Sequence, residues 1–178
     1  MPGTVVDEMW AQFGVLSELV EEDAKENADL TTKNFLEANF SKTMLICAAS
    51  YFERRLSIYV EEFTNHASSS NTLVVSLVKN ESIHRQYHTW FKWDESNANA
   101  LFAMFGNDFK RSMIGKINGN DDLRRSVSDF LKIGHLRNSL AHGDFGNFDL
   151  GKTSTEVYEL YQSAIRFVDF VPEALRAY

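Results

Sequence analysis

Apolar residues recur at helical spacing along much of the chain. One stripe near the N-terminus consists of Val6, Met9, Trp10, Phe13, Leu16 and Val20. A second, longer stripe consists of Leu45, Ala48, Phe52, Leu56, Tyr59 and Phe63. Because residues three or four apart lie on one face of an α-helix, each stripe predicts an amphipathic helix that needs a partner for its apolar side.

Polar segments divide the middle of the chain. Residues 67–71 form a polar break rich in serine, after which apolar positions restart at Leu73, Val74, Leu77 and Val78. This pattern predicts a connection between two helices. Residues 90–99 are polar with three aromatic rings and predict irregular structure. Residues 100–117 predict a helix that is interrupted or bent near Gly106, because glycine is a poor helix former.

The C-terminal third contains two further predicted helices. Asn120 or Asp121 can cap the first of them, whose apolar positions are Leu123, Val127, Phe130, Leu131 and Leu136. Thr153 followed by Glu156 fits a capping box and predicts a terminal helix that runs until about Pro172. No alternation typical of strands competes with this pattern. We therefore expect an all-α bundle of about five to seven helices that forms one domain over residues 1–178.

Composition agrees with one globular domain. The 178 residues are 44% hydrophobic and 13% aromatic, which is enough for one sizeable core. Cys47 is the only cysteine, so no intramolecular disulfide can form, and we expect a buried structural thiol in a reducing compartment. No apolar stretch approaches the roughly 20 residues of a membrane span, and no secretory signal is evident at the N-terminus. We expect a cytoplasmic protein without a membrane partner.

The charge balance restricts how the chain can bind nucleic acid. The formal net charge is −7. Broad electrostatic capture of phosphates usually needs a basic surface. Any RNA site must therefore be local.

The segment Arg137-Asn138-Ser139-Leu140-Ala141-His142-Gly143 brings together a permanent cation, an amide and an imidazole. A neutral imidazole can take the proton of a ribose 2'-hydroxyl, and an imidazolium can protonate a departing 5'-oxygen. A guanidinium can stabilise the charge that builds up on the phosphoryl group. This set of groups can cleave a phosphodiester without a metal ion.

This motif is similar to that of the HEPN superfamily, in which an arginine is followed by a polar residue and then by a histidine. Further segments resemble its RiboL-PSP-HEPN branch, so that the likeness covers roughly residues 35 to 175; they are 48–55, 101–106 and 153–158. The resemblance implies a metal-independent endoribonuclease that needs no cofactor, acts as a homodimer on RNA and serves as a toxin or in anti-phage defence. It also implies an antitoxin or regulatory partner protein. By the same resemblance, Arg137 is the phosphate stabiliser, His142 the acid and base, and Asn138 a positioning group.

Helix geometry adds a condition to this interpretation. Five residues separate Arg137 from His142, which places them about 140° apart around a helix and about 7.5 Å apart along it. One regular helix cannot easily aim both at one phosphate, so either a second copy or a break in the helix is needed. Gly143, Gly146 and Gly151 predict a flexible loop that leaves the imidazole of His142 open to substrate.

Several neighbouring groups are candidates for supporting roles. Glu53 borders the apolar face of the second helix, where its carboxylate could orient His142 or pair with Arg137. The basic residues Arg54, Arg124 and Lys132 could hold the RNA backbone, although a solvated charged face is the alternative. Asp144 departs from the family pattern, because some HEPN toxins carry there a tyrosine that an antitoxin modifies.

Three alternatives remain open. The first is a non-catalytic HEPN-like module that binds RNA or protein, which the acidic charge favours. The second is a metal site at Glu81, His84 and His88, which share a face if the helix there is continuous. The third is base stacking on the rings of the segment 90–93, for which aromatic packing is the alternative.

Overall fold

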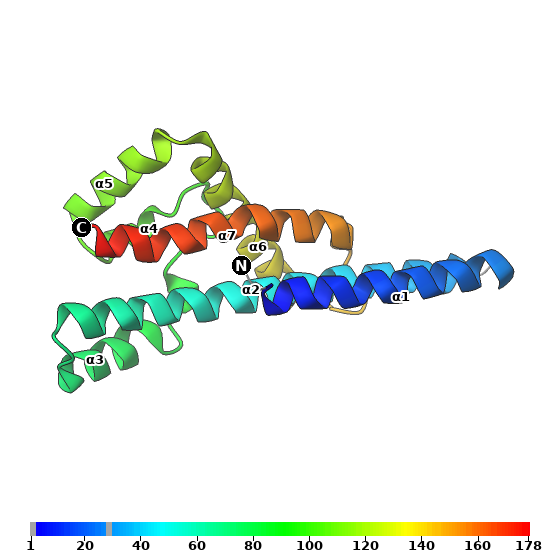
Figure 1. Cartoon of the computed structure of the whole chain (residues 1–178), viewed down its shortest axis with the longest axis horizontal. Coiled ribbons are helices and arrows are strands. Elements are labelled where there is room, and N and C mark those ends of the chain that lie inside the picture. The colour runs from blue at the N-terminus through cyan, green and yellow to red at the C-terminus, as the bar shows by residue number, and fades with distance from the viewer. Residues whose placement is uncertain (1–2, 28–29) are drawn as a thin grey trace. The chain divides into compact units, whose positions relative to one another are not determined.

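The computed structural model describes residues 3–27 and 30–178, except for the side chains of residues 23–27, and this part of the chain is all-α (Figure 1). The seven α-helices are α1 (Val5–Asn27), α2 (Leu30–Ala67), α3 (Thr72–Val78), α4 (Asn99–Ala103), α5 (Asn107–Asn118), α6 (Asp121–His142) and α7 (Ser154–Arg176). A π-helical turn, η1 (Lys79–Ile83), and a 3-10 turn, η2 (Tyr87–Thr89), lie between α3 and α4. The described residues contain no β-strand, and the predicted all-α bundle of five to seven helices is confirmed. Within the same ranges, no helix has both the length and the apolar character that crossing a membrane requires.

The chain divides into two compact units. Unit 1 consists of Met1–Tyr51 and Ile133–Tyr161, and unit 2 consists of Phe52–Lys132 and Gln162–Tyr178. The boundaries fall inside α2, α6 and α7 and not in a linker. A single domain over residues 1–178 stays a prediction.

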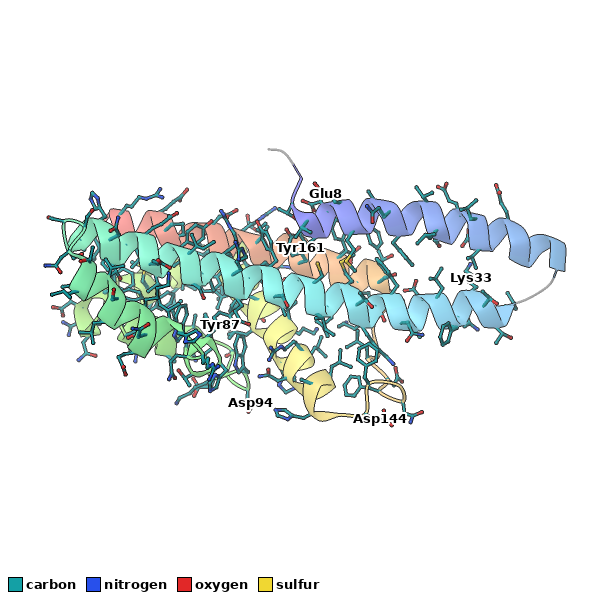
Figure 2. All side chains as sticks on the ribbon, turned by 90° about the horizontal axis from the view of Figure 1, so that it is seen from below. Glu8, Lys33, Tyr87, Asp94, Asp144 and Tyr161 are labelled. Atoms are coloured by element: carbon teal, nitrogen blue, oxygen red, sulfur yellow. The ribbon has the colours of Figure 1, made fainter. Side chains whose placement is uncertain are left out.

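Unit 1 contains a helical hairpin. Helix α1 runs beside the N-terminal half of α2 (Figure 1), and the rings of Phe13 and Phe40 stack between them with centroids 3.7 Å apart. Lys33 of α2 forms an ion pair with Glu21 of α1 at 2.6 Å (Figure 2). Met44 of α2 is fully buried. The predicted apolar stripe of α1 therefore packs partly on α2, through Phe13, and partly on α7, where Trp10 stacks on Tyr158, whereas Leu16 of the stripe is 51% exposed.

The start of α1 is tied to α7. Thr4 and Asp7 form a capping box, since the Thr4 N–H donates to Asp7 Oδ2 at 2.6 Å and the Asp7 N–H donates to Thr4 Oγ1 at 3.2 Å. The hydroxyl of Tyr158 donates to Asp7 Oδ1 at 2.9 Å. The hydroxyls of Thr4 and Tyr161 lie 2.6 Å apart, and burial raises the pKa of Tyr161. One carboxylate thus caps α1 and fixes it to α7.

Asp7→Asn is expected to make the stability of the protein depend less on pH in the acidic range. Burial alone would raise the pKa of Asp7, but hydrogen bonds from the Thr4 N–H and from the Tyr158 and Thr4 hydroxyls outweigh it, so the pKa is lowered. A lowered folded-state pKa stabilises the protein above the pKa of the unfolded carboxyl, about 3.9, and this stability is lost as pH falls through the folded value. Melting temperatures of both proteins between pH 3 and 7 should therefore differ most near neutrality and converge in acid. An equal difference at every pH would contradict this.

Unit 2 is organised around one aromatic ring. Phe130 of α6 is 1% exposed and lies within 6.0 Å, centroid to centroid, of four other rings. These rings belong to Phe52, Phe91, Trp93 and Phe167. Beside them, the buried Ser126 hydroxyl accepts a hydrogen bond from the Phe167 N–H at 2.6 Å. Phe130 therefore joins α2, α6, α7 and the segment after η2 in one core.

The breaks between helices agree with the prediction. Ser69 and Ser70 adopt positive φ angles after α2, and the Asn71 side chain caps α3. Gly106, with φ of 100°, separates α4 from α5. The Asn120 side chain accepts the Leu123 N–H at 3.0 Å at the start of α6.

Two helix limits and one burial expectation differ from the prediction. Helix α2 begins at Leu30, well before the apolar stripe that predicted it. Helix α7 continues through Pro172 to Arg176, because a proline near the end of a helix removes a single backbone hydrogen bond. Cys47 is half-buried, not fully buried, and burial raises the pKa of its thiol, which favours the unreactive form.

Candidate active site

The predicted motif occupies the last turns of α6, within unit 1. Arg137 and Asn138 are half-buried, and the Arg137 Nη1 donates to Asn138 Oδ1 at 3.1 Å. His142 is the last residue of α6 and is exposed. Asn138 and His142 are four residues apart and therefore share a face of the helix. The structure brings the cation and the amide into contact and leaves the imidazole open to solvent.

Helix α6 is continuous through the whole motif. Its last residue is His142, and the next N–H, that of Gly143, still donates to the Ser139 carbonyl at 3.0 Å. The break that could have brought Arg137 toward His142 is therefore absent. The two side chains start about 140° apart around the helix and about 7.5 Å apart along it. The arrangement with a second copy, the other one that the sequence left open, stays a prediction.

The loop after His142 contains several specific contacts, and its flexibility stays a prediction. Both Asp144 side-chain oxygens accept hydrogen bonds, from the Gly146 N–H at 3.1 Å and from the Asn147 side chain at 2.7 Å. The Phe148 N–H donates to the Asp144 carbonyl at 2.8 Å. Figure 2 shows Asp144 in this loop, directly after α6. Asp144 therefore holds the loop together through both of its side-chain oxygens.

Gly143 is required by the packing of this loop. A Cβ atom added at Gly143 would lie 2.8 Å from Phe148 Cδ2 and 3.2 Å from the Ser139 carbonyl oxygen. Phe148 is half-buried and follows His142 by six residues. The ring of Phe148 thus lies directly against the residue that follows the imidazole.

Gly143→Ala is expected to destabilise the protein by about 1–3 kcal/mol, the usual cost of overpacking. The reason is that the Phe148 ring must move away from the end of α6. Gly14→Ala is a matched control, because nothing lies within 4 Å of a Cβ at that helical position. Urea unfolding of the two variants gives the difference in the free energy of unfolding. Equal stability would show that the loop adapts without cost.

Lys42 of α2 anchors the same loop and was not among the predicted site residues. It is 5% exposed, its Nζ donates to the Phe145 carbonyl at 2.8 Å, and it lies 5.3 Å from the centroid of the Phe145 ring. The sequence does contain a sign of this role. Lys42 lies three residues before Leu45, on the backward extension of the apolar stripe of α2, where a charged residue is unexpected.

The start of α7 is held by a carboxylate of α2 as well as by its own capping box. Glu37 Oε1 accepts both the Ser154 N–H and the Ser154 hydroxyl, each at 2.6 Å. Thr153 and Glu156 form the predicted capping box, with bonds of 2.9 and 3.2 Å, and the Thr153 N–H lowers the pKa of Glu156. Glu37 and Lys42 together fix both ends of the segment between α6 and α7.

Other predicted site residues belong to unit 2, so their relation to the motif stays a prediction. Glu53 is half-buried, whereas Arg54 and Lys132 are exposed. Arg124 is also exposed and pairs with Asp121 at 2.6 Å, within the first turn of α6. An exposed pair of this kind leaves a guanidinium accessible to phosphate.

The described residues support neither rival site. The proposed metal site needed a continuous helix from Glu81 to His88, but Glu81 lies in the π turn, His84 is extended and Arg85 has a φ of 61°. Accordingly, no three acidic, histidine or cysteine side chains of the described residues gather where they could hold a metal ion. Trp90 and Phe91 are 1% and 3% exposed, so they form core and are not a platform for bases.

Comparison with known proteins gives one match. Residues 15–177 match the model of the family described as RiboL-PSP-HEPN. No curated protein and no solved structure matches the chain. The matched region includes the whole of α6, its motif and the loop that follows.

Proposed function

Because the chain belongs to the RiboL-PSP-HEPN family, we propose that it is a metal-independent endoribonuclease whose active site is formed by Arg137, Asn138 and His142 of two copies. The family is a HEPN-type domain, which gives the chain a nuclease-like or RNA-related role. The residue types of the motif support cleavage in particular. A cation and an acid–base group are the two functions that metal-free phosphodiester cleavage requires.

The position of the motif on one continuous helix carries this proposal. His142 is exposed at the end of α6, and Arg137 starts on a different side of the same helix. An isologous dimer repeats each residue across a twofold axis, so the Arg137 of one copy can face the phosphate that the His142 of the other copy contacts. The cleft between the two copies then presents an arginine and a histidine to the same phosphate.

In this site His142 transfers protons and Arg137 stabilises the negative charge on the phosphate. One neutral imidazole removes the proton of the ribose 2'-hydroxyl, whose oxygen attacks the adjacent phosphorus. Arg137 binds the phosphate oxygens while negative charge increases on them. The imidazolium formed in this way then protonates the departing 5'-oxygen, which leaves a 2',3'-cyclic phosphate and a 5'-hydroxyl end. Asn138, which already holds the guanidinium, positions it for this contact.

The surroundings of the site are part of the same proposal. Arg54, Arg124 and Lys132 bind the RNA backbone and offset locally the net charge of −7, and Glu53 supports the motif. The cellular role is that of a cytoplasmic toxin or anti-phage effector, whose cleavage of RNA an antitoxin or regulatory protein keeps in check.

Incubation of the full chain with labelled tRNA and unstructured RNA in EDTA tests the proposal. Cleavage products with 2',3'-cyclic phosphate ends are expected. The double variant Arg137→Ala/His142→Ala, purified in the same way, controls for contaminating nucleases. A dimer that binds both RNAs without cutting either would support the second candidate, a non-catalytic binding module, which the acidic composition favours.

A further inference from the structure

Lys42 is a buried cation whose hydrogen-bond partners in the described residues are backbone carbonyls. Its Nζ donates to one carbonyl at 2.8 Å and lies 3.5 Å from a second, that of Gly146. In the described part of the chain, no carboxylate forms an ion pair with it. An ammonium has three hydrogens, so at least one remains for another acceptor. Buried lysines are normally paired, and an acceptor from outside the chain would complete this one.

Lys42 lines a pocket within unit 1. The pocket has a volume of 410 Å³, within the range of about 300–1,000 Å³ that small-molecule sites occupy. Helix α2 contributes Asn34, Glu37 and Lys42 to its wall, and the segment between α6 and α7 contributes residues 146–150 and 152–153. Both walls are held in place, because Lys42 and Glu37 bond the opposite segment.

The charges of the pocket select a neutral polar ligand. The lining contains two carboxylates and two ammonium groups, Glu37 and Asp149 against Lys42 and Lys152. Glu37 Oε1 bonds Ser154, and Asp149 Oδ1 accepts the Gly151 N–H at 2.9 Å, so each carboxylate keeps one oxygen for a donor. Because the Lys152 ammonium is already paired with Glu156 at 3.3 Å, a phosphate in the pocket would meet two carboxylates and only one ammonium that has no carboxylate partner among the described residues. A neutral ligand with hydrogen-bond acceptors on one edge and donors on another can bond both the Lys42 ammonium and the two carboxylate oxygens.

The pocket lies next to the motif. Phe148 lines it and also lies against Gly143, the neighbour of His142. The ring of Phe145, which is 43% exposed, stands in the same loop with the Lys42 ammonium beside it. RNA-binding proteins read unstacked bases through such combinations of polar groups and rings.

We infer that this pocket binds a guanine base of the RNA, close to the phosphate that is cleaved. The inference rests on the proposed function for the placement of the strand. Guanine offers O6 and N7 as acceptors for Lys42, and its N2 amino group and N1–H as donors to the carboxylate oxygens. Adenine presents an acceptor at N1, where guanine has a donor. The pyrimidines lack the N7 acceptor.

Binding of free nucleosides tests the pocket separately from cleavage. The probes are guanosine, adenosine, cytidine, uridine and inorganic phosphate, titrated into the full-length His142→Ala variant and followed by calorimetry or NMR. Guanosine is expected to bind at least tenfold more tightly than the other probes. Lys42→Met and Asp149→Asn, each added alone to the His142→Ala variant, should each weaken guanosine binding at least tenfold. Asparagine keeps the acceptor for the Gly151 N–H, so the loop should fold in that variant.

Two controls remove the same kinds of charged group, an ammonium and a carboxylate, elsewhere in unit 1. Lys33→Met removes an ammonium from the hairpin, and Glu8→Gln removes an exposed carboxylate from α1 (Figure 2). Neither residue lines the pocket, and guanosine binding should be unchanged in both. Equal binding of all four nucleosides, tighter binding of phosphate, or unchanged binding in both pocket variants would overturn the inference.

Cleavage mapping separates the two proposals. If the wild type cuts RNA, the sequenced ends should be enriched in guanine at one fixed position beside the cut, and Asp149→Asn should lower that enrichment. Cutting without base preference, together with absent guanosine binding, would overturn the pocket and leave the nuclease. If the chain cuts no RNA but binds guanosine, and the pocket variants abolish that binding, the nuclease is overturned and the pocket is left.

Discussion

Arg137→Ala and His142→Ala are each expected to lower RNA cleavage by about 10²–10⁴-fold, the usual contribution of a positioned acid–base group. His142 is exposed at the end of α6, and Arg137 is half-buried and bonds its neighbour Asn138. Neither side chain belongs to the buried core, so neither truncation leaves a cavity there. The loss should therefore appear in the rate of cleavage and not in stability. Thermal melting and the oligomeric state of each variant check this.

An equal mixture of the two inactive variants is expected to recover activity. A mixed dimer holds one intact Arg137 and one intact His142, on different chains. If half of the dimers are mixed and each has one of two such pairs, the recovery reaches at most about a quarter of the wild-type rate. The mixture must be allowed to exchange subunits before the assay. A site contained within one chain predicts no recovery, because neither variant holds both residues.

The converse mixture tests the same point. Excess Arg137→Ala/His142→Ala chain should suppress wild-type cleavage, since a mixed dimer then has both residues on one chain only. His135→Ala is the control for His142→Ala, because it also removes a histidine that is exposed on α6, seven residues before His142. Wild-type activity that stays proportional to the wild-type chain in this mixture would contradict the two-copy site.

Phe130→Ala is expected to cost about 3–5 kcal/mol of the free energy of unfolding, the usual range for a buried phenylalanine. The ring is 1% exposed and contacts four other rings of unit 2, so its removal leaves a cavity and unpaired aromatic faces. Total stabilities of domains are about 5–15 kcal/mol, so the variant should be partly unfolded at physiological temperature. Urea or thermal unfolding followed by circular dichroism measures the loss.

The control for Phe130→Ala is Phe35→Ala. Phe35 of α2 is 71% exposed, and surface substitutions usually change stability by no more than about 0.5 kcal/mol. A loss below 1 kcal/mol at Phe130, or equal losses at both positions, would show that the aromatic cluster does not organise unit 2.

The sequence predicted the helices where apolar periodicity and caps are clear. The stripe of α2, the capping box at Thr153 and the break at Gly106 were correct. The stripe of α1 was correct at Val6 and Phe13 but not at Leu16, which is 51% exposed. The start of α2 was missed because residues 30–43 are largely polar and include threonine and asparagine, which favour helix weakly. The irregular backbone from Lys79 to Thr89 contains neither glycine nor proline, so nothing local marked the positive φ of Arg85.

The site could be predicted only as far as it is local in sequence. Arg137, Asn138 and His142 lie in one short segment, so their spacing could predict the chemistry and the need for either a second copy or a break in the helix. Lys42 reaches the carbonyl of Phe145, 103 positions away in the chain, and Glu37 reaches Ser154, 117 positions away. Contacts of this separation follow from tertiary packing, which single-sequence periodicity does not describe.

The two anchors on α2 make the length of the chain between them critical. Glu37 and Lys42 stand on one continuous helix, and each bonds a different end of the segment that joins α6 to α7. One inserted residue between them would turn one anchor by about 100° and shift it by about 1.5 Å relative to the other. Insertions and deletions at positions 38–41 should therefore displace one end of the segment between α6 and α7 relative to the other, although they change no residue of the motif.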